Sequence, residues 1–191
     1  MSEKLVPVGI SARHVHVSRE HLDILYGKDY QLTVKKDLSQ PGQFASNETV
    51  DLVTEKSTFK NVRILGPERK ETQVELSMTD AMKLRLKAPV RDSGDIKGSP
   101  GLTIVGPQGS VKIEEGVIVA CRHIHMTPAD AEAFGVKDKE IVKVKCEGER
   151  ALVFDKVLIR VNDQYKLEMH VDTDEGNAAL LSNNVTLELV K

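Results

Sequence analysis

The chain has 191 residues, 40% of them hydrophobic, which is enough for one compact domain or two small domains with a real core. Its 27 basic and 29 acidic residues give a net charge of −2, so the composition provides no general attraction to nucleic acid or to an anionic membrane. Aromatic residues make up only 4% and tryptophan is absent, which argues against stacking on single strands, and we expect neither nucleic-acid nor membrane partners.

The amino-terminal residues 1–10 contain Glu3 and Pro7 and lack the basic start and apolar run of an export signal. No stretch of the chain approaches the roughly 20 apolar residues that a membrane-spanning helix needs. The two cysteines, Cys121 and Cys146, are too few for a disulfide framework and suit a reducing compartment. We therefore expect a cytoplasmic protein with two free thiols.

An Arg-His-x-His motif occupies residues 13–16 at the start of the chain. If this segment is a strand, alternate side chains share a face, and His14 and His16 project together about 6.6 Å apart. That spacing lets two imidazoles bind one metal ion, although an isolated pair of this kind is more often a partly exposed pair at a strand edge. Ser18 is placed to cap a short helix ending at a Tyr-Gly pair, and a strand is expected at residues 31–34.

The next segments combine strands with possible anion ligands. We expect strands at 50–53, 61–65 and 72–76, and a helix at 79–87 that opens at Thr79. Arg63 and Arg69 flank a Leu-Gly-Pro turn, and Arg69 lies shortly before Glu75. Arginine binds phosphate through its planar fork, so a phosphate site beside a metal is one interpretation and ordinary surface charge is the other. Weaker candidates of the same kind are Arg13, Lys56 and Arg122.

Residues 88–110 form the least regular stretch, because prolines and glycines recur through it and only residues 102–105 indicate a strand. A connection this long is usually either functional or disordered. Its Arg-Asp-Ser-Gly-Asp core at residues 91–95 favours a functional loop.

A second Arg-His-x-His motif lies at residues 122–125, after a strand expected at 117–120. Thr127 is placed to cap a helix with Pro128 in its first position, and that helix ends at a Phe-Gly pair before a strand at 140–145. The order strand, helix, glycine stop and strand therefore occurs twice. This repetition predicts an internal duplication that carries two histidine pairs.

Each histidine pair needs a further ligand, because catalytic zinc sites usually have three protein ligands and an open position. Residues 167–174 loosely resemble residues 74–80, with Glu168 matched to Glu75 and His170 to Ser77 on one strand face, so Glu75 can complete the first pair and His170 the second. An exposed strand glutamate is the alternative for Glu75. Imidazole and carboxylate donors suit zinc, and manganese, cobalt and ferrous iron accept the same ligands. His21 has no counterpart in the second copy and is expected at the surface.

The carboxy-terminal third adds strands expected at 151–159, 166–171 and 185–190. Many short strands with few helices predict a mainly β fold. We expect two small antiparallel β-barrel domains that arise from the internal duplication, each capped by short α-helices.

Several motifs together resemble the phosphate propanoyltransferase family, a group of phosphotransacylases. These motifs are residues 11–16, 64–69, 72–75, 88–95, 121–125 and 169–170, and they span nearly the whole chain. The resemblance implies one barrel domain from residues 13–120 and another from residues 1–12 plus 121–191, with the active site between them.

The resemblance also implies roles for individual residues. One zinc ion would be bound by His14, His16 and Glu75, and a second by His123, His125 and His170. Arg69 would be the phosphate ligand, and Ser93 would lie near the reacting groups. The implied contacts to coenzyme A are Ile10, Ser11, Ala12, Lys56, Arg63 and Asn177.

The implied activity is a phosphate acyltransferase that interconverts propanoyl-CoA or acetyl-CoA plus phosphate with acyl phosphate plus coenzyme A. It would use two zinc ions and no covalent acyl-enzyme, because neither cysteine has a recognisable base beside it. The alternatives are a zinc-dependent acyl-CoA hydrolase and a non-catalytic, metal-stabilised binding module. The sequence leaves acyl-chain preference and oligomeric state open.

Family members that work inside bacterial microcompartments carry an extra amino-terminal targeting helix. Only 13 residues precede His14, and they show no amphipathic helical pattern. We therefore expect a cytoplasmic enzyme that is not encapsulated.

Overall fold

The computed structural model describes residues 4–183 and 185–190, and the chain forms two compact units. Unit 1 contains the amino-terminal end as far as Ala12, the short segment Ser39–Pro41, and everything from Cys121 onward. Unit 2 contains Arg13–Leu38 and Gly42–Ala120. Glu3, which helped to exclude an export signal, lies outside the described residues.

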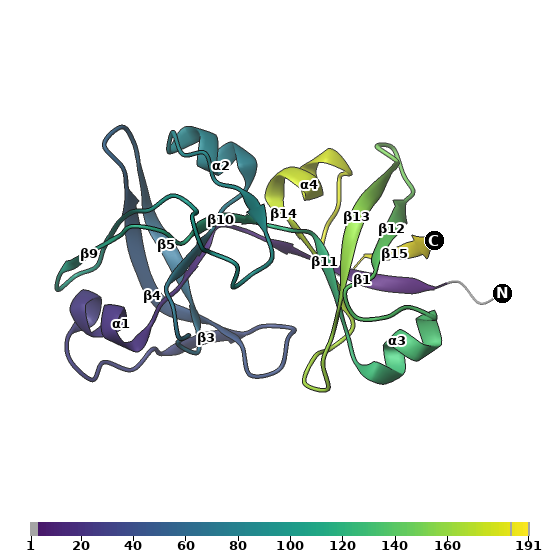
Figure 1. The fold of residues 1–191 in the computed structure, drawn as a ribbon, viewed down its shortest axis with the longest axis horizontal. Coiled ribbons are helices and arrows are strands. Elements are labelled where there is room, and N and C mark those ends of the chain that lie inside the picture. The colour runs from purple at the N-terminus through teal and green to yellow at the C-terminus, as the bar shows by residue number, and fades with distance from the viewer. Residues whose placement is uncertain (1–3, 184, 191) are drawn as a thin grey trace. The chain divides into compact units, whose positions relative to one another are not determined.

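Unit 1 is built on a closed barrel with the strand order β1-β14-β11-β13-β12-β15 (Figure 1). Its strands are β1 (Leu5–Ser11), β11 (His123–Met126), β12 (Ile141–Cys146), β13 (Leu152–Val161), β14 (Glu168–Asp172) and β15 (Thr186–Val190). Alternate residues of these strands point inward and form an apolar core that includes Val8, Ile124 and Met169. Helices α3 (Pro128–Phe134) and α4 (Thr173–Ala178) lie on opposite sides of the barrel.

Unit 2 is built on a second sheet with the order β7-β10-β6-β2-β5-β4-β8-β9, and β3 pairs with β4 off this path. The strands are β2 (His14–His16), β3 (Val34–Asp37), β4 (Phe44–Val53), β5 (Thr58–Gly66), β6 (Gln73–Glu75), β7 (Val90–Arg91), β8 (Leu102–Val105), β9 (Ser110–Ile113) and β10 (Val117–Ala120). Helices α1 (Arg19–Tyr26) and α2 (Met78–Lys83) complete the unit. A separate apolar core, which includes Val15, Leu52 and Ile64, fills it.

The mainly β fold class is confirmed, but two details of the sheets differ from the expectation. Within the described residues, the unit 2 sheet runs from β7 to β9 without closing. Both sheets are mixed, because β2 pairs parallel with β5, and β11 pairs parallel with β13. Each of these pairs is separated by a helix and at least one further strand, and such a crossover allows parallel pairing where a hairpin does not.

Helix caps account for where the helices begin. Thr127 and Asp130 form a capping box at α3, with Pro128 in the first turn, and Gly135 ends the helix in the left-handed conformation with φ 63°. The expected start of α2 was wrong. Ser77, rather than Thr79, is the N-cap, because its side chain accepts a hydrogen bond from the backbone N–H of the third helical residue.

Helix α4 was not expected from the sequence, since it is short and contains Gly176, and glycine disfavours helices. Asp172 and Glu175 form a capping box that starts it. A Cβ atom at Gly176 would lie 3.0 Å from Cδ1 of Ile10, so glycine allows α4 to pack closely on β1. The helix is therefore positioned by its cap and by this close approach.

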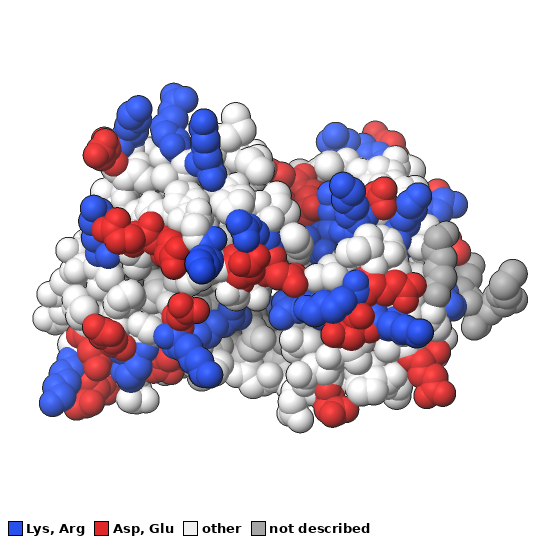
Figure 2. Space-filling model, viewed as in Figure 1, with Lys and Arg blue, Asp and Glu red and all other residues white. Residues whose placement is uncertain are grey.

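No helix among the described residues is long and apolar enough to cross a membrane. On the face shown in Figure 2, basic and acidic side chains are interspersed. This agrees with the near balance of charges in the sequence. Cys121 and Cys146 are both free thiols, as expected.

Candidate metal centres

The first candidate centre lies in unit 2, where β2 and β6 pair antiparallel with His14 opposite Glu75. This register puts His14, His16 and Glu75 on one face. The two imidazole rings lie 4.9 Å apart between centroids. The Nε2 atoms of His14 and His16 lie 3.4 and 3.7 Å from the Glu75 carboxylate oxygens. One ligand atom from each residue falls within 4.8 Å of the others, which is a distance that one metal ion can bridge.

The electrostatics of this cluster favour a neutral imidazole beside a carboxylate. Burial lowers the pKa of His16 well below its ordinary value, and the neighbouring charge of His14 lowers it further. Burial alone would raise the pKa of Glu75, but His14, His16 and Arg69 together hold it well below its usual range. A neutral His16 and an ionised Glu75 both suit metal binding, because the ligands must present lone pairs rather than protons.

Polar side chains hold Glu75 in place. The Ser93 hydroxyl donates to Oε1 of Glu75 at 3.0 Å, and the Gln73 amide donates to the same oxygen at 2.6 Å. Ser93 also accepts from the Arg69 guanidinium at 3.0 Å. The backbone N–H of Arg69 bonds to the carbonyl of Val17 just beyond β2, which ties Arg69 to the strand that carries the histidines. Ser93, Arg69 and the first cluster are thus one connected network.

A small cavity of about 170 Å³ adjoins this network. Its lining includes Arg69, Lys70, Gln73 and Gly94. The backbone N–H of Gly94 donates to Gln73 at 2.7 Å, so this part of the long loop is ordered against β6. Two basic residues and one acidic residue, Glu71, therefore line the cavity beside the first cluster, which leaves an excess of positive charge for an anion.

The second candidate centre lies in unit 1 on β11 and β14, which pair antiparallel with His123 opposite His170. The ring of His125 lies 4.7 Å from that of His123 and 4.9 Å from that of His170. One nitrogen from each of the three falls within 4.8 Å of the others. Burial, with the nearby charges of His123 and His170, lowers the pKa of His125 to about 2. His125 is therefore neutral at ordinary pH and can offer a lone pair to a metal ion.

Each histidine of the second cluster has a hydrogen-bond partner on one ring nitrogen. His123 Nδ1 donates to the carbonyl of Cys121 at 2.7 Å, and His125 Nδ1 donates to the side-chain oxygen of Gln40 at 3.1 Å. His170 Nε2 lies 2.6 Å from the carboxylate of Glu168. Such partners fix the tautomer and leave the opposite nitrogen with its lone pair.

The strand registers revise how the two copies correspond. His14 faces Glu75 and His123 faces His170, so His170 occupies the place of Glu75. The sequence comparison had set Glu168 against Glu75 and was two residues out of register. The N-caps Ser77 and Asp172, which each lie two residues after the third ligand, support the corrected correspondence.

The arginines before the two histidine pairs make structural ion pairs. Arg13 donates to both carboxylate oxygens of Asp80 at 3.0 Å, and its guanidinium lies over the Phe59 ring at 4.5 Å. Arg122 lies 2.9 Å from Glu175. These contacts connect each histidine strand to α2 or α4 and account for both arginines without an anionic ligand.

Both clusters fit a zinc ion by the chemistry of their donors. One offers two imidazoles and a carboxylate, and the other offers three imidazoles, which are the ligand sets of catalytic zinc. In the second cluster, each histidine also has the outer hydrogen-bond partner that zinc-binding histidines usually have. That these six residues bind zinc remains a prediction, although the structure brings each set of three together.

The expected coenzyme A contacts fall in both units. In unit 1, Ile10 and Ser11 lie on β1 opposite Val171 and Asp172, Ala12 follows them and is exposed, and Asn177 is exposed on α4. In unit 2, the Arg63 guanidinium donates to the carbonyl of Ser46 at 2.8 Å. Coenzyme A binding at these positions stays a prediction.

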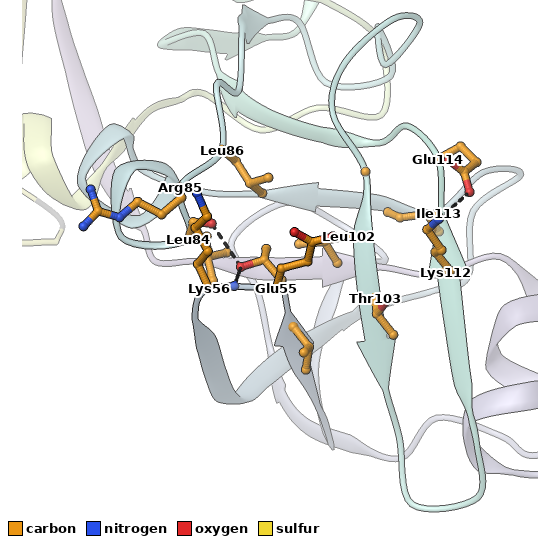
Figure 3. Close-up of a pocket in the computed structure, with 13 residues that line it drawn as sticks. Glu55, Lys56, Leu84, Arg85, Leu86, Leu102, Thr103, Lys112, Ile113 and Glu114 are labelled. Carbon is orange, nitrogen blue, oxygen red and sulfur yellow. Dashed lines mark hydrogen bonds and ion pairs between the residues drawn. The ribbon is translucent and has the colours of Figure 1, made fainter.

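Lys56 lies elsewhere in unit 2, on the turn between β4 and β5. There it lines a cavity of about 600 Å³ with Glu55, Leu84, Arg85 and residues of β8 and β9 (Figure 3). None of the six candidate metal ligands lines this cavity.

The sequence analysis missed the residues that support the ligands, chiefly Gln40, Gln73 and Glu168. Glu168 was placed on the same strand face as His170 without a supporting role, and Gln73 could have been found in the same way, because it lies two residues before Glu75. Gln40 is 85 residues away from His125 and had no local signal. His21 was expected at the surface, but it is half-buried and its ring bonds to the hydroxyl of Thr72 at 2.7 Å.

Comparison with known proteins identifies a family. The family model described as phosphate propanoyltransferase matches residues 7–182. A phosphate propanoyltransferase of Thermotoga maritima is 58% identical over 185 residues, covering 96% of this chain and 88% of that protein. Proteins of the same name from Lachnoclostridium phytofermentans and Listeria monocytogenes are 56% and 50% identical, covering 93% and 97% of this chain and 83% and 87% of theirs.

Proposed function

Because the chain belongs to the phosphate propanoyltransferase family and is an acyltransferase, we propose that it interconverts propanoyl-CoA or acetyl-CoA plus phosphate with acyl phosphate plus coenzyme A. The observation that carries this proposal is the pair of three-ligand clusters, each with two buried ligands and one half-buried ligand, and one of them connected to Arg69 through Ser93. The reaction brings an anion to a thioester, and such a reaction needs positive charge close to the reacting atoms.

The two clusters hold one zinc ion each. The ligands of the first are His14, His16 and Glu75, and those of the second are His123, His125 and His170. When bound, zinc supplies Lewis acidity that stabilises negative charge developing on a carbonyl oxygen or on a departing sulfur.

Arg69 binds the phosphate. Its side chain lines the small cavity beside the first cluster, and Ser93 fixes one arm of its guanidinium. The planar guanidinium matches two phosphate oxygens at once, which orients the anion as well as attracting it. Lys70 in the same cavity adds a second positive charge, and the carboxylate of Glu71 offsets one of the two.

The acyl group passes directly from sulfur to oxygen. A phosphate oxygen forms the new bond to the thioester carbonyl carbon, the carbon–sulfur bond breaks, and coenzyme A leaves as the thiolate. Two observations support the lack of a covalent acyl-enzyme. The hydroxyl oxygen of Ser93 accepts hydrogen bonds from Arg69 and Gln73, which occupy the lone pairs that a nucleophile would use, and burial raises the pKa of the Cys146 thiol, which disfavours the nucleophilic thiolate.

The direct test is the release of coenzyme A from propanoyl-CoA and acetyl-CoA as a function of phosphate concentration. We expect release to depend on phosphate and to saturate with it. In Arg69→Ala, loss of the fork should raise the phosphate KM by about 10-fold or more, consistent with charge-assisted bonds worth about 1.5–3 kcal/mol.

Arg69→Lys serves as the matched variant, because it keeps the charge and removes the planar fork. We expect its phosphate KM to fall between those of the wild type and Arg69→Ala. Release of coenzyme A at the same rate without phosphate would instead identify a zinc-dependent hydrolase. No turnover of either acyl-CoA would identify a metal-stabilised binding module.

A further inference from the structure

Gln40 lies in a three-residue segment that belongs to a different unit from the residues on either side of it. The segment Ser39–Pro41 packs within unit 1, although the chain on both sides of it belongs to unit 2. Gln40 is only 3% exposed. Burying a polar amide costs free energy unless its donors and acceptor are paired. The hydrogen-bond partners of Gln40 therefore indicate what its buried side chain does.

The amide of Gln40 is paired at both ends. Its oxygen accepts from Nδ1 of His125 at 3.1 Å and from the backbone N–H of Lys166 at 3.2 Å. Its nitrogen donates to the backbone carbonyl of Lys166 at 2.9 Å. The two bonds to Lys166 fix which end of the amide is the oxygen, and that oxygen faces His125.

The neighbouring residue, Ser39, is connected to a second histidine of the cluster through Glu168. The Ser39 hydroxyl bonds to the Glu168 carboxylate, which also pairs with Nε2 of His170. Gly9 lies beside this carboxylate, and a Cβ atom there would lie 3.2 Å from Cδ of Glu168. The space that Glu168 occupies is thus available because residue 9 is a glycine. The segment Ser39–Pro41 is hydrogen-bonded both to His125 and to the carboxylate that pairs with His170.

This geometry has a specific consequence for His125. With Nδ1 donating to Gln40, the ring proton is fixed on that nitrogen and the lone pair lies on Nε2. A metal ion requires a ring held in one tautomer and one orientation, and outer partners of this kind typically change metal affinity about 10–100-fold.

We propose that Gln40 is a positioning residue for the three-histidine cluster, and that it sets the tautomer and ring orientation with which His125 binds metal. This inference rests on the zinc sites proposed above. It adds that tight metal binding at this cluster requires a residue, Gln40, that is not itself a ligand.

The test measures how tightly purified protein holds zinc against a chelator of graded concentration. We expect Gln40→Ala to lose one zinc equivalent at roughly 10–100-fold lower chelator concentration than wild type, while the other equivalent is unaffected. Adding His123→Ala to this variant should remove the weakened equivalent and leave the tight one, whereas adding His14→Ala should remove the tight one. Gln164→Ala, at an exposed glutamine of the same unit, should behave as wild type.

Gln40→Glu separates positioning from simple packing. It keeps an oxygen acceptor for His125 but loses the amide donor to Lys166. If Gln40 acts through His125, Gln40→Glu restores most of the affinity that Gln40→Ala loses. Equal loss in both variants, or no loss in Gln40→Ala, would overturn the inference. Wild type that binds no zinc would overturn the proposed metal sites themselves.

Discussion

Among single residues, the third ligand differs between the two clusters and its supporting residue differs with it. In unit 2 a carboxylate, Glu75, receives a hydrogen bond from the amide of Gln73. In unit 1 an imidazole, His170, pairs with the carboxylate of Glu168 at the equivalent position. In unit 2 the ligand accepts the hydrogen bond and the supporting residue donates it, whereas in unit 1 the ligand donates and the supporting residue accepts. The duplication has therefore kept the geometry while changing the chemistry.

The six ligands could be proposed from sequence because a strand places alternate side chains on one face. The residues that orient them could be predicted only where they share that strand. Ser93 and Gln40 reach their partners from loops, and their contacts depend on how the chain folds back rather than on local spacing. Only Ser93 was anticipated, and that came from family resemblance.

Ser93 provides a prediction about the reaction type. Ser93→Ala removes a donor to Glu75 and an acceptor for Arg69, so we expect activity to fall about 10–100-fold, the range typical of residues that orient metal ligands. The phosphate KM should rise, because Arg69 loses its fixed orientation. Steady-state kinetics at varied phosphate measures both effects.

Ser93→Thr is the matched variant, since it retains a hydroxyl and should recover part of the activity. A loss on the order of a million-fold in Ser93→Ala, as occurs when a nucleophilic serine is removed, would contradict direct transfer.

Among the helices and strands, boundaries and registers were the least predictable features. The helix expected at residues 79–87 instead spans Met78–Lys83, because Ser77 caps its amino-terminal end and Arg85, with a positive φ of 60°, cannot continue it. The correspondence between the two copies was wrong by two residues. A shift of two keeps the same strand face, so alternation alone could not detect it.

Glu48 on β4 provides a test of the hydrogen bonds that connect this strand to residues 30–33. It is 6% exposed, and it accepts hydrogen bonds from the backbone N–H and hydroxyl of Thr33 and from the hydroxyl of Tyr30. Burial alone would raise the pKa of Glu48, but these bonds bring it below the ordinary value of 4.5. Because the folded pKa is lowered, its stabilisation is present above pH 4.5 and is lost as pH falls through the folded pKa.

We therefore expect Glu48→Gln to lower the free energy of unfolding by about 1–3 kcal/mol at neutral pH, since bonds to the ionised group are lost. The difference from wild type should shrink as the pH falls below 4.5. Denaturant unfolding at several pH values measures this. Glu55→Gln, at an exposed position of the same unit, should show no such difference, and a Glu48→Gln effect independent of pH would contradict the role of the charge.

Across the described residues, the sequence was sufficient for the mainly β class and for the duplicated order of strand, helix and strand, although the strand expected at residues 31–34 instead spans Val34–Asp37. It did not predict that both sheets are mixed, because pairing direction depends on crossovers between strands distant in the chain, such as β2 with β5. It also did not predict that Ser39–Pro41 leaves unit 2 to pack in unit 1. Both features depend on long-range contacts.

Two separate zinc sites in one acyltransferase are the feature on which the proposed function depends. Zinc content per chain tests them, measured on wild type, His14→Ala, His123→Ala and the control His21→Ala, whose histidine belongs to neither cluster. We expect two equivalents in wild type and His21→Ala, and one in each of the other variants. Wild type without zinc, or His123→Ala with unchanged zinc, would contradict the two-site proposal.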